Sequence, residues 1–505
     1  MFQNTAFAFV VRVLSRDRLM RPRLPELKAV LRYEEEGQIV DWDGDDPENP
    51  KNWPFRYKVF LSFLVCMMTT FVYMGSSIVS PAIELIQRDF HVGQPVASLS
   101  LSLFVWGYGL GPCFLSPLSE ISAVGRNWIY VISLGIFFIL QVPTALVGNV
   151  AGFLILRFLT GVAGSPVIST GGASMGDMWR LEGGFANAIA FWGFAACGGP
   201  VVGPVIGGFT SQALGWRWTI WPLLFASATA WVMIFFFLPE TGEQSILTLR
   251  ARELRRVTGN QELRSRGELS DQHVSTSKLL YETFCRPVEL TITEPIMLFS
   301  NSYIAYVYGI LYCFFESYPI TLMERHGFNA GQLGLSFISG WVFVLIALFF
   351  YTQYNNRFVA RKFKDGTWQP EYRMVVCLVG GILMAGSLFW FGWTSFPAVL
   401  WISPLVAFGV FTAGMFYLFQ GFLGYIGENY PRYMASAYAS NSMLRAAVAG
   451  AFPIFSTIMF HKLTVQGGCS LLGGLGLLLI PFTVFFYFRG DRLRARSKKA
   501  GMPPL

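Results

Sequence analysis

Residues 59–80 read VFLSFLVCMMTTFVYMGSSIVS, a run that contains no charged side chain. The hydrocarbon core of a bilayer is roughly 30 Å thick, and about 20 helical residues cross it. A backbone in lipid has no water to bond, so such a run folds as a helix. The stretch therefore predicts a transmembrane helix.

Eleven more runs of this kind follow along the chain. The twelve predicted spans cover residues 59–80, 95–118, 127–147, 150–176, 184–210, 218–238, 295–320, 332–354, 374–396, 398–426, 435–460 and 466–488. The composition agrees, because 53% of the 505 residues are hydrophobic and 13% are charged, whereas soluble domains usually carry about a quarter charged residues. We therefore predict an all-α membrane protein with twelve transmembrane helices, and a disordered chain or a soluble enzyme is a poor match.

The basic residues indicate how the predicted spans are oriented. Of the 38 Lys and Arg residues, 32 fall on one side of the spans. The opposite side holds four, which are Arg88, Arg217, Arg325 and Lys462. By the positive-inside rule, the basic side, with both termini, is cytoplasmic. This asymmetry accounts for the net charge of +8, so we expect the lipid bilayer and no nucleic acid as a partner.

The order of the spans predicts five segments. They are a cytoplasmic N-terminal segment (1–57), a six-helix bundle (58–238), a cytoplasmic central loop (239–294), a second six-helix bundle (295–488) and a cytoplasmic tail (489–505). Two pseudo-symmetric bundles of similar length are typical of transporters whose site lies at the midplane between them. The apolar stretch Ala6–Val11 is too short to span a membrane, and we expect it to form a surface amphipathic helix.

Two motifs predict close helix contacts. In residues 116–127, SPLSEISAVGRN, a tight turn requires Gly125. We expect Arg126 to latch helix ends here by bridging Glu120 and Asp177, although the pair could instead be solvated at the surface. Glycines four apart in span five let another backbone approach, and a proline bends the helix. The members of this second motif are Gly199, Gly203, Pro204, Gly207 and Gly208.

With these motifs the chain resembles the major facilitator superfamily and, within it, the fungal twelve-span drug:proton antiporters. Residues 116–127, Arg157–Gly164 and the span-five motif are similar to the family's turn, arginine and antiporter motifs. More specific matches are DPENPKNWP at 46–54, LPET at 238–241 and YVYGILY at 306–312. The turn differs from the wider superfamily in having Glu120 where Asp is usual.

The resemblance implies the major facilitator fold and a proton-coupled exporter of small organic molecules. Drugs, toxins or secondary metabolites would be the substrates, and alternating access across the plasma membrane would be the mechanism. No cofactor is implied, because a proton gradient supplies the energy. We expect a monomer.

Three charged residues lie within the predicted spans: Arg157, Glu316 and Arg445. A charge inside the membrane is costly, so each is expected to face the bundle interior with a partner or water. The resemblance implies that Arg157 takes part in proton coupling. The alternative for Arg157 is a packing clamp bonded to backbone carbonyls.

The other candidates for a substrate cavity lie in spans seven, ten and eleven. Tyr308, Tyr312 and Glu316 share one helical face and suit flat or cationic molecules, although Glu316 could instead be solvated near the outer surface. Gln420 in span ten is a candidate because an amide in lipid needs a partner. The alternative is that the aromatic row to which it belongs only faces lipid or packs in the core. Asn441 and Arg445 could bind substrate, but a packing role is favoured.

Other chemistry has little support in the sequence. It contains neither a GxxxxGK[ST] phosphate loop nor a GxSxG nucleophile elbow, and its histidines and cysteines lack metal spacing. We therefore expect neither an enzyme nor a metal site. Two alternatives remain, a proton-coupled or facilitative importer of a nutrient such as a polyamine, sugar or organic acid, and a non-transporting membrane sensor. The Gly203-Pro204 motif favours export.

Overall fold

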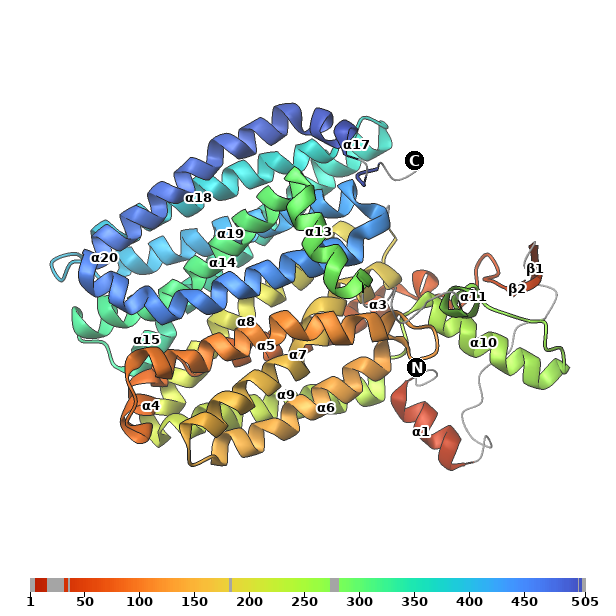
Figure 1. Cartoon of the computed structure of the whole chain (residues 1–505), viewed down its shortest axis with the longest axis horizontal. Helices are drawn as coiled ribbons and strands as arrows, with labels where there is room; N and C mark the ends of the chain where they lie inside the picture. The colour runs from red at the N-terminus through yellow and green to blue at the C-terminus, as the bar shows by residue number, and fades with distance from the viewer. Residues whose placement is uncertain are drawn as a thin grey trace.

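The structure, a computed structural model, describes residues 5–15, 31–34, 37–180, 184–272, 281–497 and 499–501. Its main body is a bundle of long helices (Figure 1). Within the described ranges, eleven helical segments are long and apolar enough to cross a membrane. Their main helices are α3 (Phe55–Ser77), α5 (Gln94–Glu120), α6 (Gly125–Leu146), α7 (Val150–Met178), α8 (Phe185–Leu214), α9 (Ile220–Phe237), α14 (Pro295–Tyr318), α16 (Ile338–Tyr354), α18 (Arg373–Thr394), α19 (Ile402–Asn429) and α20 (Met434–Arg496).

The last of these helices contains two of the predicted spans. A straight helix of 63 residues would be about 95 Å long, roughly three times the thickness of the hydrocarbon core. Thr464 interrupts it with a φ of 63° and a ψ of 164°, and the blue ribbon reverses direction (Figure 1). The twelve-span, mainly helical fold predicted from the sequence is thus confirmed, with Thr464 as the turn between the last two spans.

The two ends of the bundle differ. The described ends of the chain lie at one end, together with α10 (Glu243–Thr258) and α11 (Arg266–Gln272) (Figure 1). We call it the basic end, because its connections are those that carry most of the Lys and Arg residues. At the opposite end lie α4 (Ile83–Phe90) and α15 (Ala330–Ser336) (Figure 1). The first bundle denotes α3 to α9 below, and the second bundle denotes α14 to α20.

Glycines determine how closely neighbouring helices approach one another. A Cβ on Gly380 of α18 would lie 2.7 Å from the carbonyl oxygen of Gly414 in α19. The reverse distance, from a Cβ on Gly414 to the oxygen of Gly380, is also 2.7 Å. Because both values are shorter than a normal contact, larger residues would force these helices apart. At this crossing, glycine therefore permits the close packing of the two helices.

The all-α prediction needs one small correction outside the bundle. A two-stranded antiparallel hairpin is formed by β1 (Leu31–Glu34) and β2 (Gly37–Val40). The amide of Val40 donates to the carbonyl of Arg264 at 2.8 Å. Val40 also packs with apolar side chains of α10 and the following segment in a separate small core. This contact joins sequences more than 200 residues apart, so the local pattern could not predict the hairpin.

The N-terminal segment is also attached to the rest of the molecule through charged groups. Arg250 of α10 donates to Asp46 at 2.6 Å and to Glu48 at 2.9 Å. Both carboxylates belong to the DPENP stretch before α3, so this motif binds the central loop. Near the N-terminus, α1 (Ala6–Leu14) places Phe7 5.0 Å from Phe236, ring centre to ring centre. Much of the predicted 1–57 segment lies outside the described residues, and the five segment boundaries stay predictions.

Candidate functional site

Helix α8 of the first bundle lies at the interface with the second bundle and carries the glycine motif. A Cβ on Gly199 would lie 2.7 Å from the carbonyl oxygen of Thr70 in α3, and one on Gly203 would lie 2.9 Å from that of Met74. Gly207 continues this face and would meet the carbonyl oxygen of Ile78. One face of α8 is therefore packed directly on the backbone of α3, as the glycine spacing predicts.

A second face of α8 meets the other bundle. A Cβ on Gly208 would collide with the carbonyl oxygen of Ala330 and lie 3.3 Å from the Cα of Gly334. A Cβ on Gly334 would in turn meet the carbonyl oxygen of Pro204. These residues bring α8 and α15 into backbone contact at the opposite end. We call the contacts of Pro204, Gly208, Ala330 and Gly334 the glycine seal.

Glu316 links the two bundles near the same end. Gln94 and Ser98 of α5 donate to its carboxylate at 2.6 and 3.1 Å. Thr457 of α20 donates to it at 2.7 Å. Glu316 is 5% exposed, so the alternative in which it is simply solvated is wrong. It is the acceptor at the centre of a buried network of uncharged donors from both bundles.

This network predicts a sealing role for Glu316. Glu316→Gln keeps the size of the side chain but places an amide NH2 group among hydrogen-bond donors. We expect it to loosen the opposite end and leave competition by organic cations unchanged. A cysteine at Ser102, one turn from Ser98 on α5, reports the loosening by faster reaction with a membrane-impermeant maleimide, in a variant without the seven native cysteines. Weaker competition by cations would instead place Glu316 in a cation site.

The middle of the interface is lined by aromatic residues from both bundles. The hydroxyl of Tyr108 in α5 donates to that of Tyr308 in α14 at 3.1 Å. Tyr308 lies edge-to-face against Tyr312, with ring centres 5.4 Å apart, and 5.8 Å from Phe419 of α19. Tyr73 of α3 packs on Tyr108 at 5.8 Å. We call these five residues the aromatic cluster.

Arg445 of α20 lies against the aromatic cluster. Its Nη2 donates to the hydroxyl of Tyr73 at 3.2 Å. Its guanidinium carbon lies 4.9 Å from the ring centre of Tyr308 and 5.3 Å from that of Phe419. Arg445 therefore touches both bundles, and each aromatic face provides a cation–π contact.

The remaining cavity candidates are also at helix interfaces. Gln420 packs against the backbone of Gly193 in α8, where a Cβ would collide with its amide nitrogen. Asn441 donates to Asn301 of α14 at 3.1 Å, so its contacts are those of the packing role. Within the second bundle, Asn301 donates further to Ser440 at 2.9 Å. Neither Gln420 nor Asn441 faces lipid.

Arg157 of α7 is enclosed within the first bundle. It has no exposed surface, and it donates through Nε to the carbonyl of Ser100 at 3.0 Å and through Nη2 to that of Gly75 at 2.7 Å. Its guanidinium carbon lies 4.5 Å from the ring centre of Phe104. Among the described residues, no carboxylate lies within ion-pair distance of it. These are the contacts expected of a packing clamp. If Arg157 also takes part in proton coupling, it does so while bonded to these two carbonyls.

The predicted latch contains the Arg126–Asp177 pair and one further carboxylate, that of Glu240. Arg126 Nε lies 2.6 Å from Asp177 Oδ2, and the two side chains are mostly buried, at 17% and 16% exposure. The carboxylate of Glu240 accepts the backbone amides of Arg126 and Asn127, each at 3.0 Å. Gly125 has a φ of +75° and leaves the space that Glu240 occupies.

Glu240 therefore supplies the second carboxylate at this turn, while Glu120 lies exposed on the surface. Sequence reasoning missed Glu240 although it lies in the LPET motif, because that motif was used only as a mark of resemblance. The second bundle contains a similar pair that was also missed. Arg373 of α18 lies 2.8 Å from Glu428 of α19.

The latch gives a second prediction. Asp177→Asn leaves Arg126 mostly buried without its carboxylate, and losing such a partner costs about 1–3 kcal/mol. We expect a lower midpoint of thermal unfolding and several-fold slower transport from the purified protein. Glu120→Gln is the matched control, and its exposed carboxylate should have a small effect. Equal effects of the two changes would contradict this assignment.

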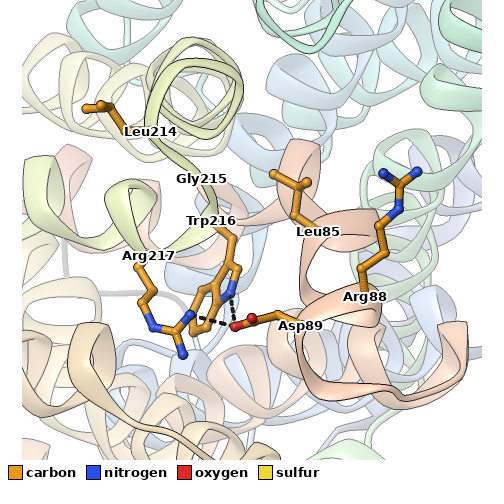
Figure 2. A pocket seen from close by; sticks show the side chains of 7 residues that line it. All are labelled: Leu85, Arg88, Asp89, Leu214, Gly215, Trp216 and Arg217. Carbon is orange, nitrogen blue, oxygen red and sulfur yellow. Dashed lines mark hydrogen bonds and ion pairs between the residues drawn. The ribbon is translucent and has the colours of Figure 1, made fainter.

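The pocket in Figure 2 lies at the opposite end of the first bundle, away from the aromatic cluster. It has a volume of about 410 Å3 and lies between α4 and η3 (Trp216–Thr219). Trp216 and Arg217 donate to Asp89 at 2.8 and 2.5 Å, while Arg88 points away from them (Figure 2). This shallow pocket is therefore organised around an ion pair that ties α4 to the start of the sixth span, α9.

The hydrogen bonds between the two bundles are unevenly distributed. In the part of the chain that the structure describes, they occur beside the glycine seal, where Gly331 donates to Gln212, at Glu316 and in the middle of the interface. At the basic end the bond between Asn187 and Asn356, 2.9 Å long, is exposed. The interface is therefore held together more firmly at the opposite end than at the basic end. Over the same described ranges, no group of three His, Cys, Asp or Glu residues could hold a metal ion.

Comparisons with known proteins agree with this architecture. The chain matches the Major Facilitator Superfamily over residues 65–453. It is 39% identical to the cycloheximide resistance protein of Candida maltosa over 475 residues, which cover 92% of this chain and 86% of that protein. It is also 39% identical to the multidrug transporter FLR2 of Candida glabrata over 473 residues, which cover 91% of this chain and 79% of that protein.

A solved structure shares the fold. It is the partially occluded inward-open conformation of the xylose transporter XylE from E. coli, with a TM-score of 0.60. The alignment covers 85% of this chain and 99% of XylE at 15% sequence identity, so the likeness is one of fold alone. Together with the matches in sequence over most of its length, this shows that the chain belongs to the major facilitator superfamily.

Proposed function

We propose that this protein exports small organic molecules across the plasma membrane in exchange for protons, by alternating access. The observation that carries the proposal is the aromatic cluster with Arg445, which both bundles build and whose firmest contacts between the bundles, among the described residues, lie on one side. The names of the relatives, a cycloheximide resistance protein and a multidrug transporter, support export of foreign or toxic compounds.

In this proposal the basic end faces the cytoplasm, following the positive-inside rule. The glycine seal and Glu316 then close the outer side, and the structure would correspond to an outward-closed state. Rocking of the two bundles would break these contacts, open the cluster outward and close the cytoplasmic side. The protein would work as a monomer and without a bound cofactor, with the proton gradient shifting the balance between the two states.

The second candidate function, import of a nutrient such as a polyamine, sugar or organic acid, would use the same moving parts. The direction of net transport depends on which protonation state favours which conformation, and the fold does not determine it. The packing of Gly199, Gly203 and Gly207 on α3, in the motif that resembles that of antiporters, favours export.

The experiment is expression of the chain in a yeast strain that lacks its own drug exporters. We expect lower accumulation of, and higher resistance to, at least one compound in a panel that includes cycloheximide and azoles. A strain carrying the same plasmid without the gene is the control. Higher accumulation of a compound would support import, and unchanged accumulation of every compound would contradict transport of this class.

A further inference from the structure

Arg445 is a buried positive charge whose hydrogen-bonding surroundings are incomplete. It is 7% exposed. One nitrogen, Nη2, donates to the hydroxyl of Tyr73, whereas the buried Nε has no hydrogen-bond partner among the described residues. Within the described part of the chain, no carboxylate lies within 4 Å of the guanidinium. Since a buried charge is stable only when it is paired or solvated, this site lacks an anionic or strongly polar group.

Arg157, the other arginine inside a predicted span, lies wholly within the first bundle. It donates to two backbone carbonyls, at 3.0 and 2.7 Å, and its buried Nη1 has no hydrogen-bond partner among the described residues. Arg445 instead lies where the two bundles meet, beside groups that would separate when they rock. The incomplete surroundings of Arg445 are therefore located in the part of the interface that a substrate would enter.

The walls around Arg445 favour a planar molecule. Tyr308 and Phe419 face its guanidinium, and Tyr73 and Tyr108 complete the enclosure from the first bundle. Tyr312 adds a buried hydroxyl close to Ser76, Tyr108 and Tyr308. Aromatic rings bind flat conjugated molecules by stacking or edge contacts, while the Nε of Arg445 can donate to an oxygen atom on the molecule's rim.

A cationic ligand does not fit the same place. Its charge would be repelled by Arg445, and the carboxylate that could compensate, Glu316, is already occupied by Gln94, Ser98 and Thr457. The sequence-based expectation of a cation site around Glu316 therefore does not carry over to the aromatic cluster. The charge beside the aromatic cluster is the positive charge of Arg445, which favours an anionic ligand.

We propose that Arg445 makes the aromatic cluster a site for planar organic acids, that is, aromatic ring systems with a carboxylate or phenolate oxygen. This inference rests on the proposed function, because it names the class of molecule that the exporter binds. The acid's oxygen would accept from Arg445, and its rings would lie against Tyr308 and Phe419. Neutral planar molecules with a carbonyl group would bind in the same way but more weakly.

The test compares two dyes that share a three-ring xanthene core and differ in charge at neutral pH. Fluorescein is anionic, and rhodamine 123 is cationic. Their binding to the purified protein in lipid nanodiscs is measured by fluorescence polarisation. We expect the wild-type protein to bind fluorescein at least tenfold more tightly than rhodamine 123. Equal affinities, or a preference for rhodamine 123, would overturn the proposal.

Substitutions at the site make the test specific. Arg445→Gln should weaken binding of fluorescein at least tenfold and leave that of rhodamine 123 unchanged or tighter. Arg445→Lys keeps the charge and should retain a preference for fluorescein. If the glutamine variant fails to fold, the lysine variant still tests whether the charge sets the preference. Arg217→Gln, in the pocket of Figure 2, is the matched control and should bind both dyes like the wild type. An unchanged dye preference in a folded Arg445→Gln protein would contradict a role in ligand choice.

The same dyes separate this inference from the proposed function. Binding needs no transport, so a preference for fluorescein without any flux in vesicles would reject the exporter and keep the ligand class. Proton-driven flux of rhodamine 123 by a protein that does not prefer fluorescein would keep the exporter and reject the ligand class.

Discussion

Replacing Gly208 with leucine is expected to reduce export at least tenfold while the protein still reaches the membrane. A Cβ at this position would already collide with the carbonyl oxygen of Ala330 and lie 3.3 Å from the Cα of Gly334. The colliding atoms are backbone atoms, which cannot rotate away, so leucine would push α8 and α15 apart. Because this contact forms the glycine seal, the outward-closed state should lose stability relative to the outward-open one.

The measurement combines transport with the cysteine reporter at Ser102. In Gly208→Leu, the reporter should react faster with an impermeant maleimide applied from the outside. The control is Gly386→Leu in α18, where a Cβ would meet nothing within 4 Å and the change in helix propensity is the same. Wild-type export together with an unchanged labelling rate in Gly208→Leu would show that the glycine seal does not govern the outer side.

Arg157→Ala is expected to abolish export driven by a pH gradient. The change removes two hydrogen bonds from a charged donor, each worth about 1.5–3 kcal/mol, and it leaves the carbonyls of Ser100 and Gly75 without their donor. Arg157→Lys should recover less than a tenth of the activity, because a single ammonium group cannot replace the planar fork that reaches both carbonyls. Pumping at the normal rate by Arg157→Ala would remove this residue from the mechanism.

Substrate counterflow, which is exchange without a gradient, separates the two roles left open for Arg157. If the arginine couples protons to transport, the alanine variant should lose gradient-driven export and keep counterflow. If it is a packing clamp, both activities should fall, together with the midpoint of thermal unfolding. The hydrogen bonds to the carbonyls of Ser100 and Gly75 fix the position of Arg157. Counterflow tests whether Arg157 couples protons to transport or only stabilises the helix packing.

The number and type of the spans could be predicted because a membrane imposes a local rule on each of them. Every apolar run long enough to cross the bilayer must be helical, and even the last two spans were separated in the sequence although α20 is continuous apart from Thr464. The burial of Arg157, Glu316 and Arg445 followed from the same rule, since a charge in such a run needs a protected position.

The partners of these charges could not be predicted, because they come from distant parts of the chain. Gln94 and Thr457 are separated from Glu316 by 222 and 141 residues, and no pattern within a helix indicates that they meet. For the same reason, the solvated alternative for Glu316 was wrong. At the latch, Glu240 lies 114 residues from Arg126, whereas the predicted Glu120 lies only six residues from it.

The most direct test of proton-driven export uses purified protein in vesicles with an imposed pH difference. With the cytoplasmic side of the protein facing outward and the interior acidified, protons leaving the vesicle should drive substrate inward. We expect accumulation of at least one compound, with the dyes and cycloheximide in the panel, and loss of that accumulation when a protonophore collapses the gradient. Equal uptake with and without the gradient, for every compound tested, would contradict a proton-driven exporter.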